Sequence, residues 1–201
     1  MDDAVVIVLF RHGITEDNRR RAYIGWTDVP VGEEAEFARV DECDLIFTSD
    51  LLRCTQTAAH LFPDQRNVPL SLFREMHFGE WEGNTYSELQ HDVAYRNWVS
   101  DPLSYAPPGG EEFKEFTSRI DEGFKAVVEQ VNRVNRKAVI ITHGGVIRYL
   151  LTKYAPTQAE FWEWKIPHGT GIELEWNLED LRRNVRCTSL REVPIMAKLN
   201  G

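Results

Sequence analysis

The sequence predicts an α/β fold in which a mostly parallel sheet lies between two layers of helices. Residues 4–10, 44–48 and 138–142 are short apolar runs, rich in β-branched side chains and bounded by charged residues. Such runs are typical of strands that are buried on both faces of a parallel sheet. Helical patterns lie between these runs, and strands that alternate with helices favour a three-layer α/β/α sandwich.

Three segments have the apolar periodicity of helices. Residues 50–62 carry one apolar stripe, and either Ser49 or Asp50 is expected to cap the first turn. Residues 110–134 repeat apolar side chains at helical spacing over a longer stretch. Residues 144–154 are expected to continue as a helix directly from the third strand.

The rest of the chain fits the same domain. Residues 171–176 and 184–190 predict two later strands, joined by the polar segment 177–183. Residues 77–107 carry aromatic side chains without a clear period and are expected to form an irregular lid over the site. A length of 201 residues suits one domain, so we expect a single domain over residues 1–201.

The charge balance argues against two classes of partner. The formal net charge is -9, from Asp+Glu 32 against Lys+Arg 23. A net acidic surface repels nucleic-acid backbones and anionic membranes, so we expect no nucleic acid and no membrane as partner. The apolar run that ends at Phe10 is too short for a signal segment or a membrane span, which predicts a cytoplasmic protein. The three cysteines are odd in number and widely spaced, which argues against a disulfide framework.

The ends of the predicted strands carry the residues that suggest chemistry. In an open parallel sheet, ligands bind at the carboxyl ends of the strands. The first strand runs into Arg11 and His12, and the third strand runs into His143. A glycine follows each histidine, and Arg53 lies one helical turn beyond the second strand. The sequence therefore predicts a site at which two histidines and two arginines converge.

These residue types suit the transfer of a phosphoryl group. Guanidinium groups and helix N-terminal amides match the charged equatorial oxygens of a phosphoryl group in transfer. A neutral imidazole is a competent nucleophile, and a covalent intermediate divides one difficult step into two. The leaving alkoxide needs a proton, so a carboxylic acid is expected nearby.

Several segments, in order along the chain, match the motifs of one known family. They are residues 11–18 (RHGITEDN), 25–30 (GWTDVP), 49–58 (SDLLRCTQTA), 74–83 (REMHFGEWEG), 108–111 (PGGE) and 142–145 (THGG). This series resembles the histidine phosphatase superfamily, which includes the phosphoglycerate mutases, and it implies a phosphoglycerate mutase-like fold. The chain departs from the family between Asp28 and Asp44, where it lacks most of a helix that the family usually has.

The resemblance implies a role for each matching residue. His12 would be the nucleophile, and Glu75 would protonate the leaving group and later activate water. Arg11, Arg53 and His143 would form the phosphate pocket, and no metal or organic cofactor is implied. Further residues expected to bind phosphate or substrate are Thr15, Asn18, Gly144 and His168.

The sequence itself supports one of these assignments, that of His168, and offers an alternative residue for another, that of Glu75. His168 lies just before the strand predicted at residues 171–176, from which it is expected to reach the rim of the site. Glu82 lies close to Glu75 in the sequence and is the best alternative to it as the acid.

The expected activity is hydrolysis of small phosphomonoesters without a metal. A mutase needs extra cationic residues for its second acidic group, yet Arg96 is the only basic residue between Gly83 and Pro107. The short chain resembles alpha-ribazole phosphatase and the broad-specificity bacterial phosphatases most. The expected partner is a small phosphorylated metabolite, bound by a monomer or a homodimer.

Three alternatives remain open at this point. The chain could be a cofactor-dependent phosphoglycerate mutase. It could be a catalytically idle member of the family that binds only phosphate or protein. A metallohydrolase is the third, although spacings such as H-E-x-x-H are absent.

Overall fold

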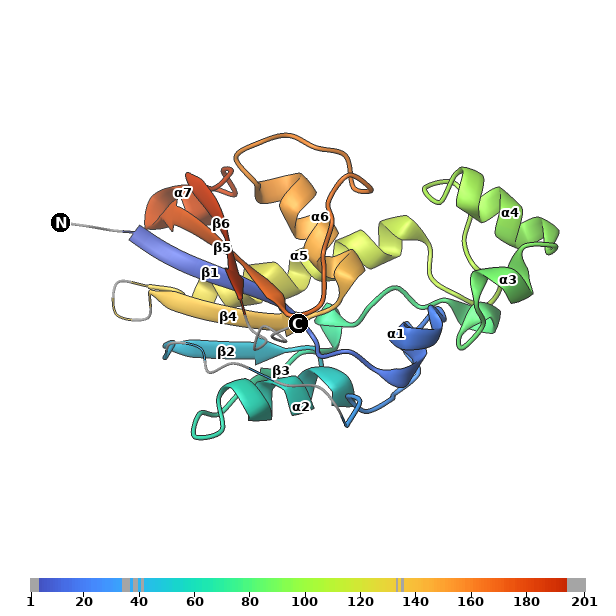
Figure 1. The fold of residues 1–201 in the computed structure, drawn as a ribbon. Coiled ribbons are helices and arrows are strands. Elements are labelled where there is room, and N and C mark those ends of the chain that lie inside the picture. Colours follow the sequence, from blue (N-terminus) through green and yellow to red (C-terminus); the bar gives the residue numbers. More distant parts are fainter. Residues whose placement is uncertain are drawn as a thin grey trace.

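A six-stranded mixed sheet forms the centre of the molecule, in the order β3-β2-β4-β1-β5-β6 (Figure 1). The structure is a computed structural model that describes residues 4–33, 37, 40, 42–132, 134 and 136–194. The strands are β1 (Ala4–Arg11), β2 (Leu45–Thr48), β3 (Val68–Pro69), β4 (Lys137–Thr142), β5 (Thr170–Asn177) and β6 (Ser189–Pro194). β3, β2, β4 and β1 run parallel, whereas β5 and β6 pair antiparallel. The predicted α/β class with a mostly parallel sheet is confirmed.

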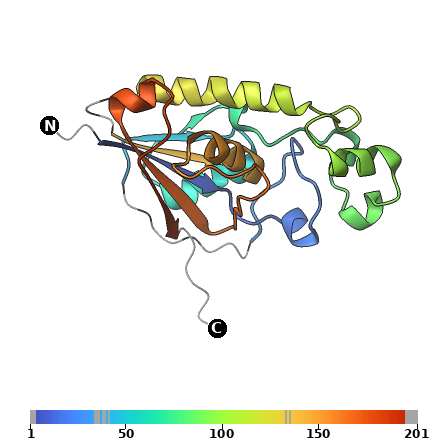
Figure 2. The same ribbon diagram turned by 90° about the horizontal axis from the view of Figure 1, so that it is seen from above.

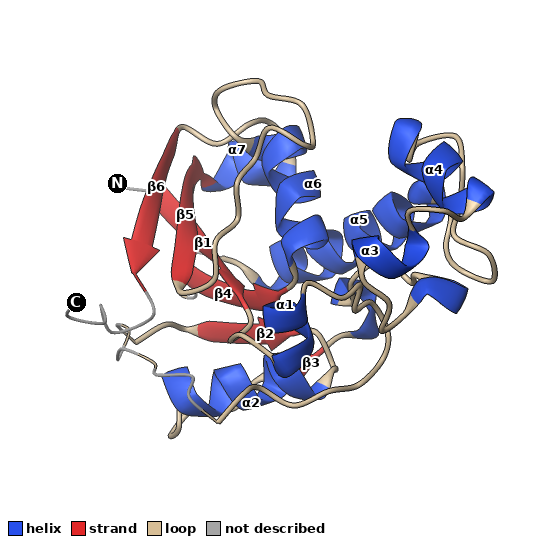
Figure 3. Ribbon diagram, turned by 45° about the vertical axis from the view of Figure 1, so that its right-hand side comes forward, coloured by secondary structure: helices blue, strands red, loops and turns tan. Residues whose placement is uncertain are grey.

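Helices cover both faces of this sheet (Figure 3). The helices are α1 (Glu16–Arg20), α2 (Leu52–Leu61), α3 (Tyr86–Leu89), α4 (Val93–Ser100), α5 (Phe113–Gln130), α6 (Gly144–Tyr154) and α7 (Leu178–Arg182). The three helices expected from periodicity are α2, α5 and α6. α5 is shorter than expected at both ends: Glu112 and Glu115 form a capping box just before Phe113, and the helix ends at Gln130. No helix among these described residues is long and apolar enough to cross a bilayer.

The alternation of side chains along β1 explains the two layers. Ile7 and Leu9 belong to the apolar core shared with α5, α6 and α7. Val8 and Phe10 point to the opposite face and belong to the core shared with α2. Since successive residues of a strand face opposite sides, one continuous apolar run fills both cores.

The second of the two late strands exists, but it begins later than expected: β6 starts at Ser189 and not at residue 184. Residues 178–182 fold into α7, and Asn184 then takes a left-handed conformation with φ 56°. The following residues dock on the end of α6: the Cys187 N–H donates to the Tyr154 carbonyl at 2.8 Å. Pairing with β5 therefore begins only at Ser189.

The N-terminus of α2 is capped by neither expected residue. Leu51 occupies the cap position without a side-chain hydrogen bond, and Asp50 instead pairs with Arg74. The Asp28 carboxylate accepts from the Leu52 N–H at 2.6 Å. A residue 24 positions away in the sequence thus caps this helix. Asp28 opens the short segment noted above, in which residues 34–36, 38, 39 and 41 lie outside the described part of the chain.

Residues 77–107, the cap, are more regular than expected. That they act as a lid over the site stays a prediction. The cap contains α3 and α4, which stand beyond the carboxyl ends of the parallel strands in Figure 1. From above, they lie near the start of α5 (Figure 2). Trp81, Tyr95 and Trp98 are buried and pack ring against ring, with centroids 5.3–6.1 Å apart. Aromatic packing rather than a helical period therefore orders the cap.

Candidate active site

The register of two neighbouring strands brings two histidines together. Arg11 of β1 pairs with Thr142 of β4, and the His12 N–H donates to the Thr142 carbonyl at 2.9 Å. His12 and His143 are each the next residue after this pair. Their side chains are buried, at 4% and 1% exposure, and their ring centroids lie 5.1 Å apart in an edge-on arrangement.

The His12 imidazole is neutral and has a defined tautomer. Its Nδ1 lies 2.7 Å from the Gly13 carbonyl oxygen, which accepts but cannot donate, so Nδ1 carries the proton. The lone pair is consequently on Nε2. Burial lowers the pKa of His12 well below 6.5, and the positive charges of Arg53 and Arg11 lower it further. This imidazole is therefore available as a nucleophile at neutral pH.

Two guanidinium groups flank the histidines: that of Arg53 is fully buried, and that of Arg11 is partly buried. Arg11 donates to the Ile166 carbonyl at 2.5 Å, and Arg53 donates to the carbonyls of Thr27 and Gly25 at 2.9 and 2.6 Å. Burial lowers the pKa of Arg11 to about 10, so Arg11 remains cationic at neutral pH. Burial also lowers the pKa of Arg53. The Nε atom of each is buried without a hydrogen-bond partner among the described residues.

His143 adds a third buried nitrogen without a partner. Its Nδ1 makes no hydrogen bond within the described part of the chain, while its Nε2 lies 3.5 Å from the Cys54 sulfur. Burial is the main reason that the pKa of His143 lies well below 6.5, and the charge of Arg53 adds to it. Orphaned polar groups are rare in protein interiors, and unpaired buried cations are costly. Since the charges of Arg53 and Arg11 both act on His143, three such nitrogens on these side chains fit a site built for an anion.

The Glu75 carboxylate lies at the N-terminus of α6. Its Oε2 accepts from the Gly145 N–H at 2.9 Å, and its Oε1 accepts from the Met76 N–H at 3.1 Å. Glu75 also lines the cavity described below. A carboxyl group in this position can give a proton to a leaving group in the cavity or take one from water.

Glu82 is occupied elsewhere and does not line that cavity. Its carboxylate accepts backbone hydrogen bonds from Gly25, Trp26, Thr27 and Phe78 at 2.9–3.0 Å. Burial alone would raise the pKa of Glu82, but these hydrogen bonds to the charged form leave it lowered. Glu82 therefore fixes the loop that carries Gly25 and Thr27, and the geometry argues against it as the acid.

Thr15 and Asn18 form one local unit. Thr15 caps α1 by accepting from the Asn18 N–H at 3.1 Å, and the Asn18 side chain accepts from the Thr15 N–H at 3.2 Å. Asn18 lines the cavity, whereas Thr15 is fully buried and does not. In the structure Thr15 caps α1 and holds Asn18 in place, and its expected contact with phosphate stays a prediction.

Gly144 lies against Arg11 at the end of β1, and His168 lies against His12, the next residue. Gly144 begins α6, and a Cβ there would be 3.4 Å from the Arg11 Cζ. The His168 Nδ1 lies 3.0 Å from the His12 carbonyl oxygen, and the rings of His168 and His12 are 5.5 Å apart. Burial, together with Arg11, lowers the pKa of His168 to about 4.

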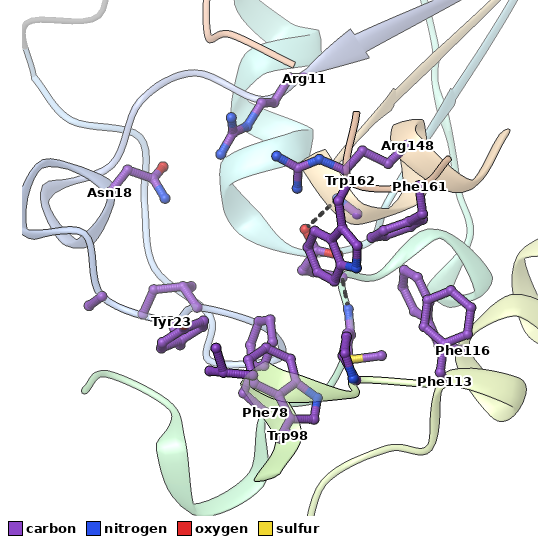
Figure 4. Close-up of a pocket in the computed structure, with 17 residues that line it drawn as sticks. Arg11, Asn18, Tyr23, Phe78, Trp98, Phe113, Phe116, Arg148, Phe161 and Trp162 are labelled. Atoms are coloured by element: carbon purple, nitrogen blue, oxygen red, sulfur yellow. Dashed lines mark hydrogen bonds between the residues drawn. The ribbon is translucent and has the colours of Figure 1, made fainter. Parts of the chain in front are cut away.

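A cavity of about 480 Å³ adjoins these residues (Figure 4). Arg11, Asn18 and Glu75 line it, together with Gly145. His12, Arg53 and His143 are more deeply buried and are outside its lining. The cavity is therefore the space that a substrate's leaving group would occupy, next to the buried anion site. The described residues contain no group of three or more His, Cys, Asp or Glu side chains that could hold a metal ion.

Two arginines that the strand ends did not identify also belong to the site. Arg148 lies one helical turn after Gly144 and lines the cavity. Arg119 of α5 donates to the backbone carbonyls of Leu72, Arg74 and Glu75 at 2.6–3.0 Å. The position of Arg148 on the helix after the second histidine was a usable signal, whereas nothing in the sequence indicated the contacts of Arg119.

The chain matches a known family over most of its length. The profile of the histidine phosphatase superfamily (branch 1) covers residues 7–185. An adenosylcobalamin/alpha-ribazole phosphatase of Salmonella typhimurium is 30% identical over 175 residues, which are 80% of this chain and 85% of that protein. A 2,3-bisphosphoglycerate-dependent phosphoglycerate mutase of Cytophaga hutchinsonii is 28% identical over 160 residues, 73% of this chain and 75% of that one.

Solved structures show the same fold. The alpha-ribazole phosphatase of Shigella flexneri superposes with a TM-score of 0.75, at 22% identity and with 98% of both chains covered. A phosphoglycerate mutase of Thermus thermophilus superposes with a TM-score of 0.68, at 28% identity, covering 96% of this chain and 98% of that one. The sheet and its flanking helices are thus shared by proteins named as phosphatases and as mutases.

Proposed function

Because this chain belongs to branch 1 of the histidine phosphatase superfamily, we propose that it hydrolyses small phosphomonoesters through a phosphohistidine on His12. The observation that carries the proposal is the hydrogen bond between His12 Nδ1 and the Gly13 carbonyl oxygen, 2.7 Å long. It fixes a neutral imidazole whose Nε2 lone pair can attack phosphorus. The unpartnered nitrogens of Arg11, Arg53 and His143 would meet the phosphoryl oxygens.

The first half of the reaction forms the phosphoenzyme. The His12 Nε2 attacks phosphorus as the ester P–O bond breaks, and the new N–P bond replaces it. Glu75, as the carboxylic acid, gives its proton to the departing alkoxide, which leaves the cavity as the alcohol. Arg11 and Arg53 stabilise the charge on the three equatorial oxygens during the transfer.

The second half returns the enzyme to its resting state. The Glu75 carboxylate takes a proton from a water molecule, and the oxygen of that water attacks phosphorus. The N–P bond breaks, inorganic phosphate is released, and His12 is again a neutral imidazole. None of these steps uses a metal ion.

The apolar character of the cap favours water over a second acid as the acceptor. The cap contributes Phe78, Trp98, Val99 and Pro102 to the cavity. Arg96, the basic residue of the segment between Gly83 and Pro107, is exposed and does not line the cavity. A mutase would need cationic groups there to hold the acidic product for return of the phosphoryl group.

A mutase remains the second candidate, because Arg148 supplies a cation besides Arg11 among the residues that line the cavity. That guanidinium could hold a carboxylate of a phosphorylated acid. The hydrolase proposal fails if 2- and 3-phosphoglycerate interconvert faster than phosphate is released from either.

The proposal is tested by phosphate release from a panel of phosphomonoesters in the presence of EDTA. The panel contains p-nitrophenyl phosphate, both phosphoglycerates, fructose bisphosphates and alpha-ribazole phosphate. We expect release that resists the chelator, is abolished in His12→Ala and is unchanged in His91→Ala, whose side chain is exposed. No release from any ester would favour an idle binding protein, and activity restored by zinc would favour a metallohydrolase.

A further inference from the structure

The thiol of Cys54 reaches the second histidine of the site from the apolar core. Its Sγ lies 3.5 Å from the His143 Nε2, although the two residues are 89 positions apart in the sequence. Cys54 is fully buried and belongs to the core that α2 shares with Val8 and Phe10 of β1. Among the described residues, His143 thus has a hydrogen-bond partner on one ring nitrogen only.

The contact with Cys54 decides which nitrogen of His143 carries the proton. Burial keeps the pKa of His143 well below 6.5, so the ring is neutral at neutral pH and holds a single proton. If the thiol donates to Nε2, the ring proton is on Nδ1. If an Nε2–H donates to the sulfur instead, Nδ1 carries a lone pair. The hydrogen bond at one ring nitrogen therefore sets the state of the other.

The Cys54 sulfur carries a proton that it can donate. Burial raises the pKa of this thiol to about 12, although the charge of Arg53 acts in the opposite direction. The fully buried Ser49 side chain hydrogen-bonds to the same sulfur. Since the Ser49 Oγ accepts from the Leu51 N–H at 3.4 Å, its O–H can donate to the sulfur and leave the S–H for His143.

An anion beside His143 favours the proton on Nδ1. This nitrogen is buried without a partner in the described part of the chain, and the charges of Arg53 and Arg11 act on the same ring. A phosphoryl oxygen accepts hydrogen bonds, so an N–H stabilises it and a lone pair repels it. With Nε2 held by the thiol, Nδ1 is the nitrogen that remains for such an oxygen.

We propose that Cys54 is a positioning residue for the phosphoryl site. Its thiol donates to the His143 Nε2 and so holds the ring proton on Nδ1, which donates to a phosphoryl oxygen. Cys54 acts through His143 and does not itself meet the substrate. The identity of the anion rests on the proposed function, whereas the position of the proton does not.

Nitrogen NMR of protein labelled with nitrogen-15 histidine reports the tautomer directly. A protonated ring nitrogen and one with a lone pair have widely separated chemical shifts. The chain has six histidines, and His143→Asn identifies the signals of His143 by their loss. We expect His143 in the wild type to carry its proton on Nδ1 at neutral pH. A proton on Nε2 would make the thiol an acceptor and overturn the inference.

Cys54→Ala removes the donor, and Cys43→Ala is its matched control. Both variants lose a buried sulfur from the same apolar core, but the Cys43 Sγ contacts Gln65, at 3.9 Å. In Cys54→Ala we expect the His143 proton to shift towards Nε2, which is the preferred tautomer of free histidine. In Cys43→Ala it should stay on Nδ1. An unchanged tautomer in Cys54→Ala would overturn the inference.

Binding of inorganic phosphate makes the test independent of turnover. Calorimetry should show that Cys54→Ala weakens binding by roughly three- to tenfold, the loss expected from one hydrogen bond, and that Cys43→Ala does not. Equal phosphate affinity in the two variants would refute the role of Cys54 whatever the turnover. The expected tautomer and affinity without hydrolysis of any ester by the wild type would support this role and refute the phosphatase proposal.

Discussion

The Glu75 carboxylate accepts a hydrogen bond of 2.9 Å from the Gly145 N–H, two residues after His143. This contact ties the candidate acid to the helix that follows the second histidine. A side chain at position 145 would displace this carboxylate, because a Cβ there would lie 2.3 Å from the Glu75 Oε1. The acid and the anion site are therefore held in one fixed relationship.

Glu75→Gln should slow the hydrolysis of phosphate esters, and the loss should be larger for esters whose alcohol is a poorer leaving group. The amide cannot protonate the alkoxide, so kcat/KM for alkyl phosphates should fall roughly 100-fold or more. p-Nitrophenyl phosphate needs little protonation and should lose much less. The measured quantity is kcat/KM, which reports formation of the phosphoenzyme; equal losses for both esters would contradict a role of Glu75 as the acid.

Arg119 is expected to act as a positioning residue for Glu75. Its guanidinium donates to the Glu75 carbonyl at 2.8 Å and forms a salt bridge with Glu111, with both side chains largely buried at 14% and 10% exposure. Arg119→Lys cannot keep all these contacts. We expect kcat/KM for alkyl phosphates to fall by about 10- to 100-fold, with a smaller loss for p-nitrophenyl phosphate.

A double-mutant cycle distinguishes positioning from general support of the fold. If Arg119 acts through Glu75, Arg119→Lys should cost little more activity in a Glu75→Gln background. Circular dichroism and urea unfolding establish that each variant is folded. Losses that simply multiply in the double mutant would mean that Arg119 does not act through Glu75.

The free energy of unfolding should fall as the pH drops below about 6.5. The folded-state pKa values of His12 and His143 are well below 6.5, and that of His168 is about 4, whereas an unfolded histidine titrates near 6.5. The unfolded chain therefore binds more protons below pH 6.5, and stability present above that pH is lost on acidification. Each fully buried histidine contributes up to about 1.4 kcal/mol per pH unit.

Urea unfolding between pH 7.5 and 5.5 measures this slope. His143→Asn should make the slope shallower, because one titrating group is removed. His91→Gln removes an exposed histidine and should leave the slope as in the wild type. An unchanged slope in His143→Asn would contradict the lowered pKa of that residue.

Asp28→Ala should destabilise the protein by about 1 kcal/mol, because Asp28 caps α2 through the Leu52 N–H. Asp28→Asn retains an oxygen acceptor and should cost much less. The comparison is made by urea unfolding of the two variants. Equal stability of the wild type and Asp28→Ala would show that the cap contributes nothing.

The sequence predicted those features of the fold and the site that depend on local residue pattern and on the order of the strands. Apolar runs identified β1, β2 and β4, and the rule that ligands bind at carboxyl strand ends brought His12 and His143 together before any geometry was known. The same rule includes Arg53, since it lies in the first turns of α2. The core of the fold and the centre of the site follow from short-range signals.

What the sequence did not predict depends on contacts between distant segments. Asp28 caps α2 from a loop, and no propensity at residues 49–50 reveals that. Residue type does not distinguish Glu75 from Glu82, although the family motif favours Glu75. Their partners do distinguish them, because Glu82 holds four backbone N–H groups while Glu75 lines the cavity. The aromatic side chains of the cap have no period because they pack as a cluster.

The proposed mechanism depends above all on a phosphoryl group that is covalently bound to His12. Glu75→Gln slows the attack of water, so brief incubation with p-nitrophenyl phosphate followed by an alkaline quench should trap the intermediate for mass spectrometry. We predict one phosphoryl group per chain, on His12, and none in the Glu75→Gln/His12→Ala double variant. A phosphoryl group on any other residue, or turnover by His12→Ala itself, would contradict the account.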